Sequence, residues 1–502
     1  MLTRQDLEAK LWGAADILRG SIDSADYKNY IFGFLFLKRL SDRFAEEAEA
    51  VERETGDKIL AWEEPDEHKF FVPRGARWED VRKLSEQIGD GLNKIAAAIE
   101  DANPRLEGII AGTDFNDERK LGPTRQRDAT LGQLVQHFSA LNLRNDNFDE
   151  PDLLGRAYEY LIGRFADDAG KKAGEFYTPR AVVHLLVSLL EPQEGQRIYD
   201  PTCGTGGMLI EAVHQIQRAG GNARNLGLSG QEKNRGTWQI AQMNMLMHDI
   251  GDFDIRVGDT IRDPQHTLGG ELARFDRVIA NPPFSLDNWG EQDVKSDDHG
   301  RFRFGMPPKS TGDYAFIQHM LASLNHEGRA GVVVPHGVLF RGGAEGKIRA
   351  GIAGEDLIDA VIGLPPNLFY GTGIPAALLL LRRAKPPERR GKVLFIDASR
   401  DYVAGKNQNV LSEAHTERVV SAYRAFEDAE KYVAVVTLAQ LAANDFNLNI
   451  SRYVDTTDPE APVDLAVALA ELADAEEQRA EAERVMNGHL CALGLLQDEV
   501  PA

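Results

Sequence analysis

Apolar positions in the first 150 residues recur with a helical period. The first predicted helix follows a Thr-x-x-Asp capping sequence, and its apolar face carries Leu7, Leu11, Ala14 and Leu18. The apolar segment 30–44 predicts a helix inside the core, and segment 84–99 predicts another helix. Residues 52–80 hold charges and prolines with few periodic apolar positions, which predicts loops. We expect residues 1–150 to form an N-terminal helical domain.

From about residue 153 onward, short apolar runs alternate with amphipathic helices. Such runs are typical of strands that are buried on both faces. The predicted strands are 197–200, 226–231, 253–257, 277–280, 331–335, 357–363 and 376–381. Their alternation with helices predicts an α/β fold, a Rossmann-like open sheet with right-handed crossovers, over residues 151–455. Ligands bind beyond the carboxyl ends of the strands in such sheets.

The final segment, 456–502, predicts a separate helix with an acidic surface. Its Ala- and Glu-rich part has apolar residues at helical spacing, and the chain from Asp455 to its end holds 12 acidic and 2 basic residues. Two interpretations stay open for this helix. It is either a solvated surface helix or a helix that docks on another chain through its narrow apolar stripe.

The composition restricts the possible partners. The chain has 502 residues, 42% apolar and 27% charged, which is typical of a globular protein with more than one domain. Its net charge of −22 is unfavourable for binding nucleic acid alone, because nonspecific affinity for DNA comes mainly from Lys and Arg. Two cysteines exclude a disulfide framework and a zinc knuckle, and we expect no metal. No apolar run approaches the about 20 residues of a membrane span. The acidic start differs from a secretory signal, so we expect a cytoplasmic protein without membrane contact.

A glycine-rich loop follows the first predicted strand. The segment 200–207 reads Asp-Pro-Thr-Cys-Gly-Thr-Gly-Gly and precedes a helix over 208–218. Its glycines allow a tight turn and close approach of a ligand, and the helix N-terminus offers unpaired N–H groups. The spacing departs from the dinucleotide-binding fingerprint, and the chain has no Gly-Lys-Ser/Thr phosphate loop, which argues against an ATP-driven motor.

Acidic residues follow the next two strands. Glu232 is placed to accept hydrogen bonds from ribose hydroxyls, and Asp259 could meet an adenine amino group. Each could equally be a turn or helix cap. The order of these residues along the sheet favours the ligand-binding interpretation.

The strongest motif follows the fourth strand, where 281–284 reads Asn-Pro-Pro-Phe. Two prolines make the loop stiff and leave its carbonyls free as acceptors. The amide of Asn281 and the ring of Phe284 would suit a planar amino group on a heteroaromatic ring. A simple proline-rich strand exit is the structural alternative.

The adjoining segment 285–311 interleaves arginines with aromatic residues. Its candidates for contact with DNA or an extruded base are Trp289, Arg301, Phe302, Arg303, Phe304 and Lys309. The segment also holds five acidic residues against four basic ones, so a mobile polar loop is an equal alternative.

Together these motifs resemble S-adenosylmethionine-dependent DNA adenine-N6 methyltransferases of the gamma arrangement. Within them, the chain is similar to the modification (M) subunits of type I restriction-modification systems. The segments that carry this resemblance are Gly-Glu-Phe-Tyr-Thr-Pro-Arg at 174–180, Gly-Asp-Tyr-Ala-Phe at 312–316 and Phe-Asn-Leu-Asn-Ile-Ser-Arg-Tyr at 446–453.

The resemblance implies roles for residues that match the family motifs. The implied residues around S-adenosylmethionine are Phe176, Tyr177, Thr178, Asp200, Gly204, Gly206, Gly207, Glu232 and Asp259. The implied catalytic residues are Asn281, Pro282, Pro283 and Phe284. The methyl group would pass directly from the sulfonium to adenine N6, after the base has left the duplex. Asn281 and the Pro282 carbonyl would accept the amino hydrogens, and no covalent intermediate is required.

The chain contains no segment that looks like a large target-recognition domain. With the charge of −22, this predicts that a separate specificity (S) subunit chooses the sequence. The family resemblance implies double-stranded DNA, a second copy of the modification subunit and a restriction (R) subunit as further partners. The alternatives are a methyltransferase for amino groups of RNA or protein, a stand-alone DNA methyltransferase, and a scaffold without activity.

Overall fold

The computed structural model describes residues 1–19, 22, 24–150, 152–168, 178–369, 375–406, 408–457 and 464–495. The chain forms two compact units, Met1–Asp455 and Thr456–Ala502. Among the described helices, none has the length and apolar character needed to cross a membrane.

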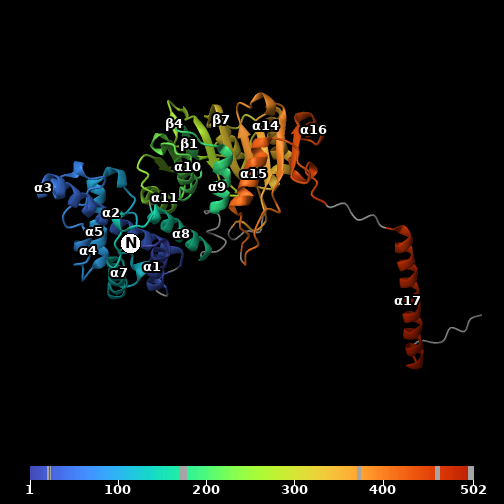
Figure 1. Cartoon of the computed structure of the whole chain (residues 1–502), viewed down its shortest axis with the longest axis horizontal. Coiled ribbons are helices and arrows are strands. Elements are labelled where there is room, and N and C mark those ends of the chain that lie inside the picture. Colours follow the sequence, from blue (N-terminus) through green and yellow to red (C-terminus); the bar gives the residue numbers. More distant parts are fainter. Residues whose placement is uncertain are drawn as a thin grey trace, which may run out of the picture. The chain divides into compact units, whose positions relative to one another are not determined.

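The N-terminal part of the first unit is helical (Figure 1). Its helices are α1 (Arg4–Leu18), α2 (Ser24–Thr55), α3 (Lys58–Glu63), α4 (Trp78–Val81), α5 (Ile88–Ala102), α6 (Glu118–Leu121), α7 (Thr124–Ser139) and α8 (Leu153–Asp168). The predicted cap of α1 is confirmed, because Thr3 accepts a hydrogen bond from the Asp6 N–H. Helix α2 contributes a row of buried aromatic residues, and Phe34 stacks on Phe138 of α7 with ring centroids 5.7 Å apart.

The prediction of loops over 52–80 is wrong in part. The end of α2, the two short helices α3 and α4 and a 3-10 turn occupy much of this range. Helix α3 starts at an Asp57 cap, and α4 buries Trp78. Helices of four to six residues are too short to show a periodic apolar pattern.

The rest of the first unit, from residue 178 onward, is called the sheet part and contains a nine-stranded sheet with the strand order β11-β10-β8-β9-β7-β6-β1-β2-β3. Its strands are β1 (Arg197–Asp200), β2 (Gly227–Glu232), β3 (Asp254–Val257), β6 (Phe275–Ala280), β7 (Leu324–Pro335), β8 (Ile358–Gly363), β9 (Ala376–Arg382), β10 (Lys392–Asp397) and β11 (Val433–Thr437). The pairs from β3 to β7 are parallel, whereas β9 runs antiparallel to β7 and β8, and β11 runs antiparallel to β10. Strands β4 (Thr267–Leu268) and β5 (Glu271–Leu272) form a separate short pair.

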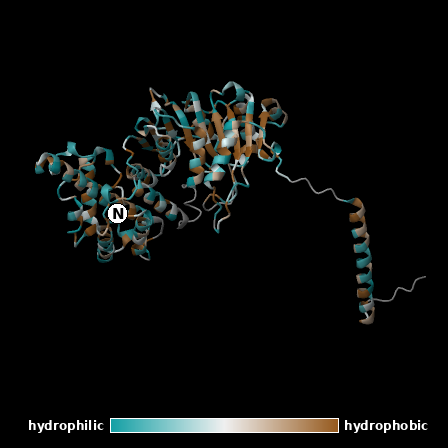
Figure 2. Cartoon of the chain, in the orientation of Figure 1, coloured by the Kyte–Doolittle hydropathy of each residue, from teal (hydrophilic) through white to brown (hydrophobic). Residues whose placement is uncertain are grey.

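Helices cover both faces of the sheet, and the strands between them are strongly apolar (Figure 2). One buried cluster joins the sheet to α9 (Arg180–Leu190), α10 (Gly207–Arg218), α11 (Arg235–Met247) and α15 (Glu413–Ala425). The opposite cluster joins it to α12 (Asp313–Ala322), α13 (Gly337–Phe340), α14 (Gly343–Gly354) and α16 (Leu438–Ala443). Within β6, Ile279 packs into the first cluster and its neighbours Val278 and Ala280 into the second, as strand geometry requires. The predicted α/β fold is confirmed.

The helical part and the sheet part share a hydrophobic core. Buried residues of α8 and three residues of α11, Ile240, Met243 and Met247, belong to the N-terminal hydrophobic cluster. The division at residue 150 stays a prediction, since the first unit contains both parts.

The second unit contains α17 (Leu465–Ala492), which starts at an Asp464 cap. It has no buried residue. The tail helix predicted from the apolar spacing is thus present, and its apolar residues, including Leu469 and Leu472, are exposed within this unit.

Candidate active site

The carboxyl ends of β1, β2, β3 and β6 meet at a cavity of about 260 Å³. This is the position where ligands bind in open α/β sheets. The predicted site residues that line it are Thr178, Asp200, Gly204, Gly207, Glu232, Asp259, Asn281, Pro283 and Trp289. The topology therefore gathers motifs from separate parts of the sequence into one site.

The loop between β1 and α10 requires glycine at two positions. Gly204 has a φ of 53°, and Gly206, which caps α10, has a φ of 81°. Side chains with a Cβ disfavour this region. The Gly204 N–H donates to Glu232 Oε2 at 3.1 Å, which ties the loop to the end of β2. Gly207 and Met208 open α10 at the cavity wall, where the first N–H groups of the helix have no intrahelical partner.

Asp200 ends β1 and is buried beneath this loop. Its Oδ1 accepts a hydrogen bond from the Thr202 N–H at 3.0 Å. Burial is the main cause that raises the pKa of Asp200 to about 8; the hydrogen bond from Thr202 opposes this rise, and the charge of Glu232 adds to it. Burial also raises the pKa of Glu232. A cation bound in the cavity would stabilise the ionised form of both carboxyls.

Glu232 is held at the end of β2 by backbone donors. Its Oε2 accepts from Gly204 and its Oε1 accepts from the Asn234 N–H at 2.7 Å. A carboxylate offers about four acceptor positions, so Glu232 can accept further hydrogen bonds from a ligand.

Asp259 serves as the cap of the turn after β3. Its Oδ1 accepts from the N–H groups of Ile261 and Arg262, and Lys233 Nζ lies 2.9 Å from its Oδ2. Burial opposes ionisation of Asp259, but the Lys233 contact and the backbone donors outweigh it and lower the pKa of this carboxyl. Lys233 is 65% exposed, and Arg262 Nη1 contacts the same carboxylate oxygen of Asp259 at 3.4 Å.

Asn281 follows β6 and brings its amide to the cavity. Its Nδ2 donates to Thr178 Oγ1 at 2.9 Å, which fixes the side chain. Its Oδ1 is buried and accepts no hydrogen bond from any described residue. An unpaired buried acceptor costs about 1–3 kcal/mol. Since this oxygen belongs to a residue that lines the cavity, it indicates a ligand that donates a hydrogen there.

Of the other residues of the Asn-Pro-Pro-Phe motif, only Pro283 lines the cavity. Pro282 is buried. Phe284 is partly buried and packs edge-on against Phe369, with ring centroids 6.0 Å apart. The described aromatic rings that line the cavity are those of Trp289 and Phe316.

The segment after this motif is largely folded onto the protein. Trp289 and Phe302 belong to a small buried cluster, and Trp289 Nε1 donates to the Pro308 carbonyl at 2.8 Å. Arg301 is 4% exposed and donates to the Thr260 carbonyl at 3.3 Å. The burial of Arg301 and Phe302 differs from the expected contact with DNA, because both side chains are used inside the protein.

Three candidates of the segment lie nearer the surface. Arg303 pairs with Glu355 at 2.8 Å and lies over the Phe304 ring at 4.2 Å. Lys309 is exposed. The side chains of Arg303 and Lys309 are accessible to DNA, and the prediction of a DNA contact stays for these two residues.

Phe176 and Tyr177 lie outside the described residues, so their predicted place at the cofactor stays a prediction. Thr178 is described, and its contact with Asn281 connects this segment to the catalytic motif.

Several cavity residues were missed by the sequence interpretation. Glu159 and Ile162 come from α8, Glu211 comes from α10, and Asn244 comes from α11. The Nδ2 of Asn244 donates to the Thr205 carbonyl at 2.9 Å, and its Oδ1 is buried without a hydrogen-bond partner. These residues lie on helices and belong to none of the sequence motifs, so their place in the cavity follows only from the folded structure.

The charges of the cavity favour a cationic ligand. Five carboxylic side chains line it against two basic ones, Arg180 and Lys233. S-adenosylmethionine carries a sulfonium and an ammonium group and would be such a ligand. The fold defines an open α/β protein with a ligand cavity at the carboxyl ends of its strands, and this cavity contains the Asn-Pro-Pro-Phe motif through Asn281 and Pro283.

Comparisons with known proteins give the family. Residues 149–461 match the family described as N-6 DNA Methylase, and residues 7–138 match the HsdM N-terminal domain. The chain is 33% identical to the type I restriction enzyme MjaVIII methylase subunit of Methanocaldococcus jannaschii, over 97% of this chain and 85% of that protein. It is also 33% identical to the type I restriction enzyme HindI methylase subunit of Haemophilus influenzae, over 78% of this chain and 86% of that protein.

A solved structure agrees with these relatives. The methyltransferase subunit of a type I restriction-modification system from Streptococcus thermophilus has a TM-score of 0.80 and 32% identity, and the match covers 90% of this chain and 100% of that one. The chain belongs to the N-6 DNA methylase family, as a modification subunit of the type I restriction-modification kind. It is an adenine-specific DNA methyltransferase, and its membership of the N-6 DNA methylase family implies S-adenosylmethionine as methyl donor. The family resemblance inferred from the motifs is confirmed.

Proposed function

We propose that the cavity holds the methyl donor and the target adenine together, with Asn281 as the residue that engages the adenine amino group. The buried, unpaired Oδ1 of Asn281 is the observation that supports this most strongly. An adenine N6 hydrogen would supply the donor that this oxygen lacks. Thr178 fixes the amide orientation, so that Oδ1 is presented to the cavity and Nδ2 is engaged elsewhere.

On the donor side, Glu232 would accept the ribose hydroxyls, and Asp259 would accept the adenine amino group of the cofactor. The loop through Gly204 and Gly206 would surround its methionine part, above the buried Asp200. When bound, S-adenosylmethionine supplies a methyl group activated by the sulfonium. The residues of the chain orient the two reactants and exclude water.

The adenine amino nitrogen is a poor nucleophile because its lone pair is delocalised into the ring. An acceptor on its hydrogens localises that pair toward the methyl group. Asn281 Oδ1 and the Pro282 carbonyl would share this task. Positioning and electrostatic stabilisation then supply most of the rate, without a covalent intermediate.

We further propose that the subunit works on double-stranded DNA only within a complex. The net charge of −22 argues against tight binding of DNA by the chain alone. A specificity subunit would supply sequence recognition, and a second modification subunit and a restriction subunit would complete the assembly. Helix α17, which has no buried residue, is available for docking on such a partner. Its DNA substrate places this activity in the cytoplasm.

The test is nucleoside mass spectrometry on DNA from a host without adenine methylation. The host expresses the chain alone, the chain with its cognate specificity subunit, or the Asn281→Ala variant with that subunit. N6-methyladenine is expected only in the second strain. Methylation by the chain alone would refute the partner requirement. Absence of methylated adenine from every strain, with the complex shown to assemble, would refute the proposed DNA substrate and favour RNA, protein or a scaffold role.

A further inference from the structure

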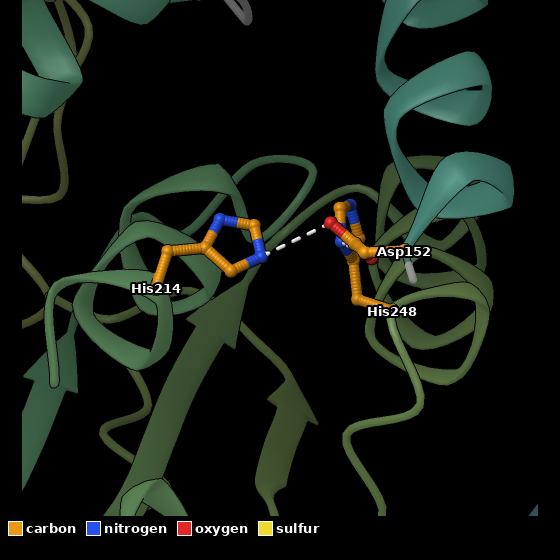
Figure 3. A group of neighbouring side chains, drawn as sticks. All are labelled: Asp152, His214 and His248. Carbon is orange, nitrogen blue, oxygen red and sulfur yellow. Dashed lines mark ion pairs between the residues drawn. The ribbon is translucent and has the colours of Figure 1, made fainter. Parts of the chain in front are cut away.

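Two histidines and one aspartate form a cluster beside the cavity, outside the residues assigned to methyl transfer. Figure 3 shows the His214 ring directed at the Asp152 carboxylate, with the His248 ring next to the same carboxylate. Their ligand atoms all lie within 4.8 Å of one another. His214 Nε2 lies 3.2 Å from Asp152 Oδ2, and His248 Nδ1 lies 2.6 Å from Asp152 Oδ1.

Each imidazole also has a carboxylate behind it. The second ring nitrogen of His214, Nδ1, lies 3.8 Å from Glu211 Oε2. The second ring nitrogen of His248, Nε2, lies 3.8 Å from Glu159 Oε1. A histidine that binds a metal through one nitrogen commonly directs the other to a carboxylate, which orients the ring and increases its basicity. Both histidines have a carboxylate near the second nitrogen, although at 3.8 Å neither contact is yet a hydrogen bond.

The ion pairs with Asp152 leave part of the cluster without hydrogen bonds. The side chain of His248 has 0% exposure, and neither of its ring nitrogens has a hydrogen-bond partner among the described residues. Asp152 Oδ1 also lacks one, because its close contact with His248 does not have hydrogen-bond geometry. Buried polar atoms are normally paired, so these atoms require another partner.

The backbone is shaped to bring these groups together. A Cβ at Gly155 would lie 2.4 Å from His248 Nδ1 and 2.6 Å from Asp152 Oδ1. Glycine at this position lets α8 approach the cluster closely. The nearby Arg156 Nε lies 4.0 Å from Asp152 Oδ2, but the Nη1 of this flexible side chain already donates to Glu150.

Although the sequence led us to expect no metal, we propose that Asp152, His214 and His248 form a binding site for one divalent transition-metal ion such as Zn²⁺. Two imidazoles and one carboxylate are a ligand set that suits this ion, with water in the fourth position. Ligand atoms around a tetrahedral ion with bonds of about 2.0–2.1 Å are separated by about 3.3 Å. The 3.2 Å contact between His214 and Asp152 meets this requirement, whereas the 2.6 Å contact between His248 and Asp152 is shorter and would open when the ion binds.

The ion would connect elements of different parts of the first unit. Asp152 directly precedes α8, whose buried residues belong to the N-terminal core, while His214 lies on α10 and His248 caps α11. Glu159 and Glu211, which lie behind the two histidines, also line the cavity. The metal would thus fix one wall of the cavity to the helical part.

The experiment uses the full chain after dialysis against a chelator. Co²⁺ is titrated while its visible absorption is recorded, and bound Zn²⁺ is counted by mass spectrometry after gel filtration. The variants are Asp152→Asn, His214→Gln and His248→Gln. His326→Gln is the matched control, because His326 is 88% exposed and lies outside the cluster. Thermal unfolding without metal checks that each variant folds, and His214 and Asp152, at 14% and 21% exposure, tolerate substitution better than the fully buried His248.

The wild-type chain and His326→Gln are expected to bind one ion per chain, with the absorption of a site of low coordination number. Removal of a carboxylate that only orients a metal ligand lowers metal affinity by about 10–100-fold. Each cluster variant loses a ligand itself, so its metal affinity should fall by more than this. Zn²⁺ should raise the unfolding temperature of the wild-type chain and of His326→Gln. It should leave the unfolding temperature of the cluster variants unchanged. No stoichiometric ion in the folded wild-type chain, or equal binding by the folded Asp152→Asn and His214→Gln variants, would overturn the proposal. Since the readout is metal binding, it is independent of methylation.

Discussion

The buried carboxyl of Asp200 gives a direct test of the electrostatics of the cavity. Its pKa is raised by burial to about 8 in the folded protein, against about 3.9 in an unfolded chain. The folded state therefore holds the proton more tightly than the unfolded state. The contribution of Asp200 to stability is full below about pH 4 and is lost as the pH rises through about 8. Asp200→Asn removes this titration while keeping the size and the acceptor for the Thr202 N–H.

The size of the effect follows from the pKa difference. Each pKa unit corresponds to about 1.36 kcal/mol, so the loss between pH 5 and pH 7 is about 2.7 kcal/mol. The entropy of unfolding is about 2.1 cal/mol/K per residue. For the 455-residue unit, 1 kcal/mol then corresponds to about 1 °C in unfolding temperature. The unfolding temperature of Asp200→Asn relative to wild type should therefore rise by about 3 °C from pH 5 to pH 7.

The assay is thermal unfolding of both proteins without ligand, across this pH range. Asp149→Asn, which changes an exposed carboxyl, serves as the control and should show a constant difference from wild type. A constant difference for Asp200→Asn as well, or one that decreases as the pH rises, would refute the conclusion that Asp200 is protonated in the folded chain.

Further predictions concern the cofactor and the tail. A cation beside Asp200 favours the ionised form of its carboxyl, and the sulfur of S-adenosylhomocysteine is uncharged. The ratio of the affinity for S-adenosylmethionine to the affinity for S-adenosylhomocysteine should therefore rise with pH, by up to about tenfold per pH unit below about 8. Calorimetry measures both affinities, and a ratio that does not change with pH would contradict this prediction. Glu232→Gln should weaken S-adenosylmethionine binding by about ten- to hundredfold, since hydrogen bonds to charged groups contribute about 1.5–3 kcal/mol; affinity within twofold of wild type would exclude the proposed contact. Removal of residues 456–502, a separate unit, should leave cofactor binding unchanged and weaken co-purification with the specificity subunit; undiminished assembly would exclude α17 as a docking helix.

The sequence predicted those features that leave a pattern in neighbouring residues, such as the buried strands and the motifs at their ends. Apolar runs predicted the central strands because strands buried on both faces must be apolar throughout. The order of strands then placed Asp200, Glu232, Asp259 and Asn281 at one edge, and the cavity contains all four. Strands β10 and β11 were missed. Lys392–Asp397 and Val433–Thr437 each hold four consecutive apolar residues, a longer run than in the predicted strand Arg197–Asp200. The sequence therefore contained a signal for both strands that the interpretation did not use.

Features that depend on distant contacts could not be predicted. The alternation of arginines and aromatic rings in 285–311 is compatible with a DNA contact and with burial, and only folding shows that Arg301 donates to the Thr260 carbonyl. The cluster of Asp152, His214 and His248 likewise has no sequence motif, because three separate helical elements supply its members.

The central claim is that Asn281 acts on the methyl-transfer step at a cavity that binds the donor independently of it. The most direct measurement is single-turnover methylation of a duplex carrying the recognition sequence, with the complex of wild-type or Asn281→Ala subunit and the specificity subunit. Donor affinity is measured on the same preparations. We predict donor affinity within about threefold of wild type and a rate lowered by about 100–1,000-fold, the effect of removing one polar group aligned with the transition state. A wild-type rate in Asn281→Ala, or a loss of methylation explained entirely by lost donor binding, would contradict the account.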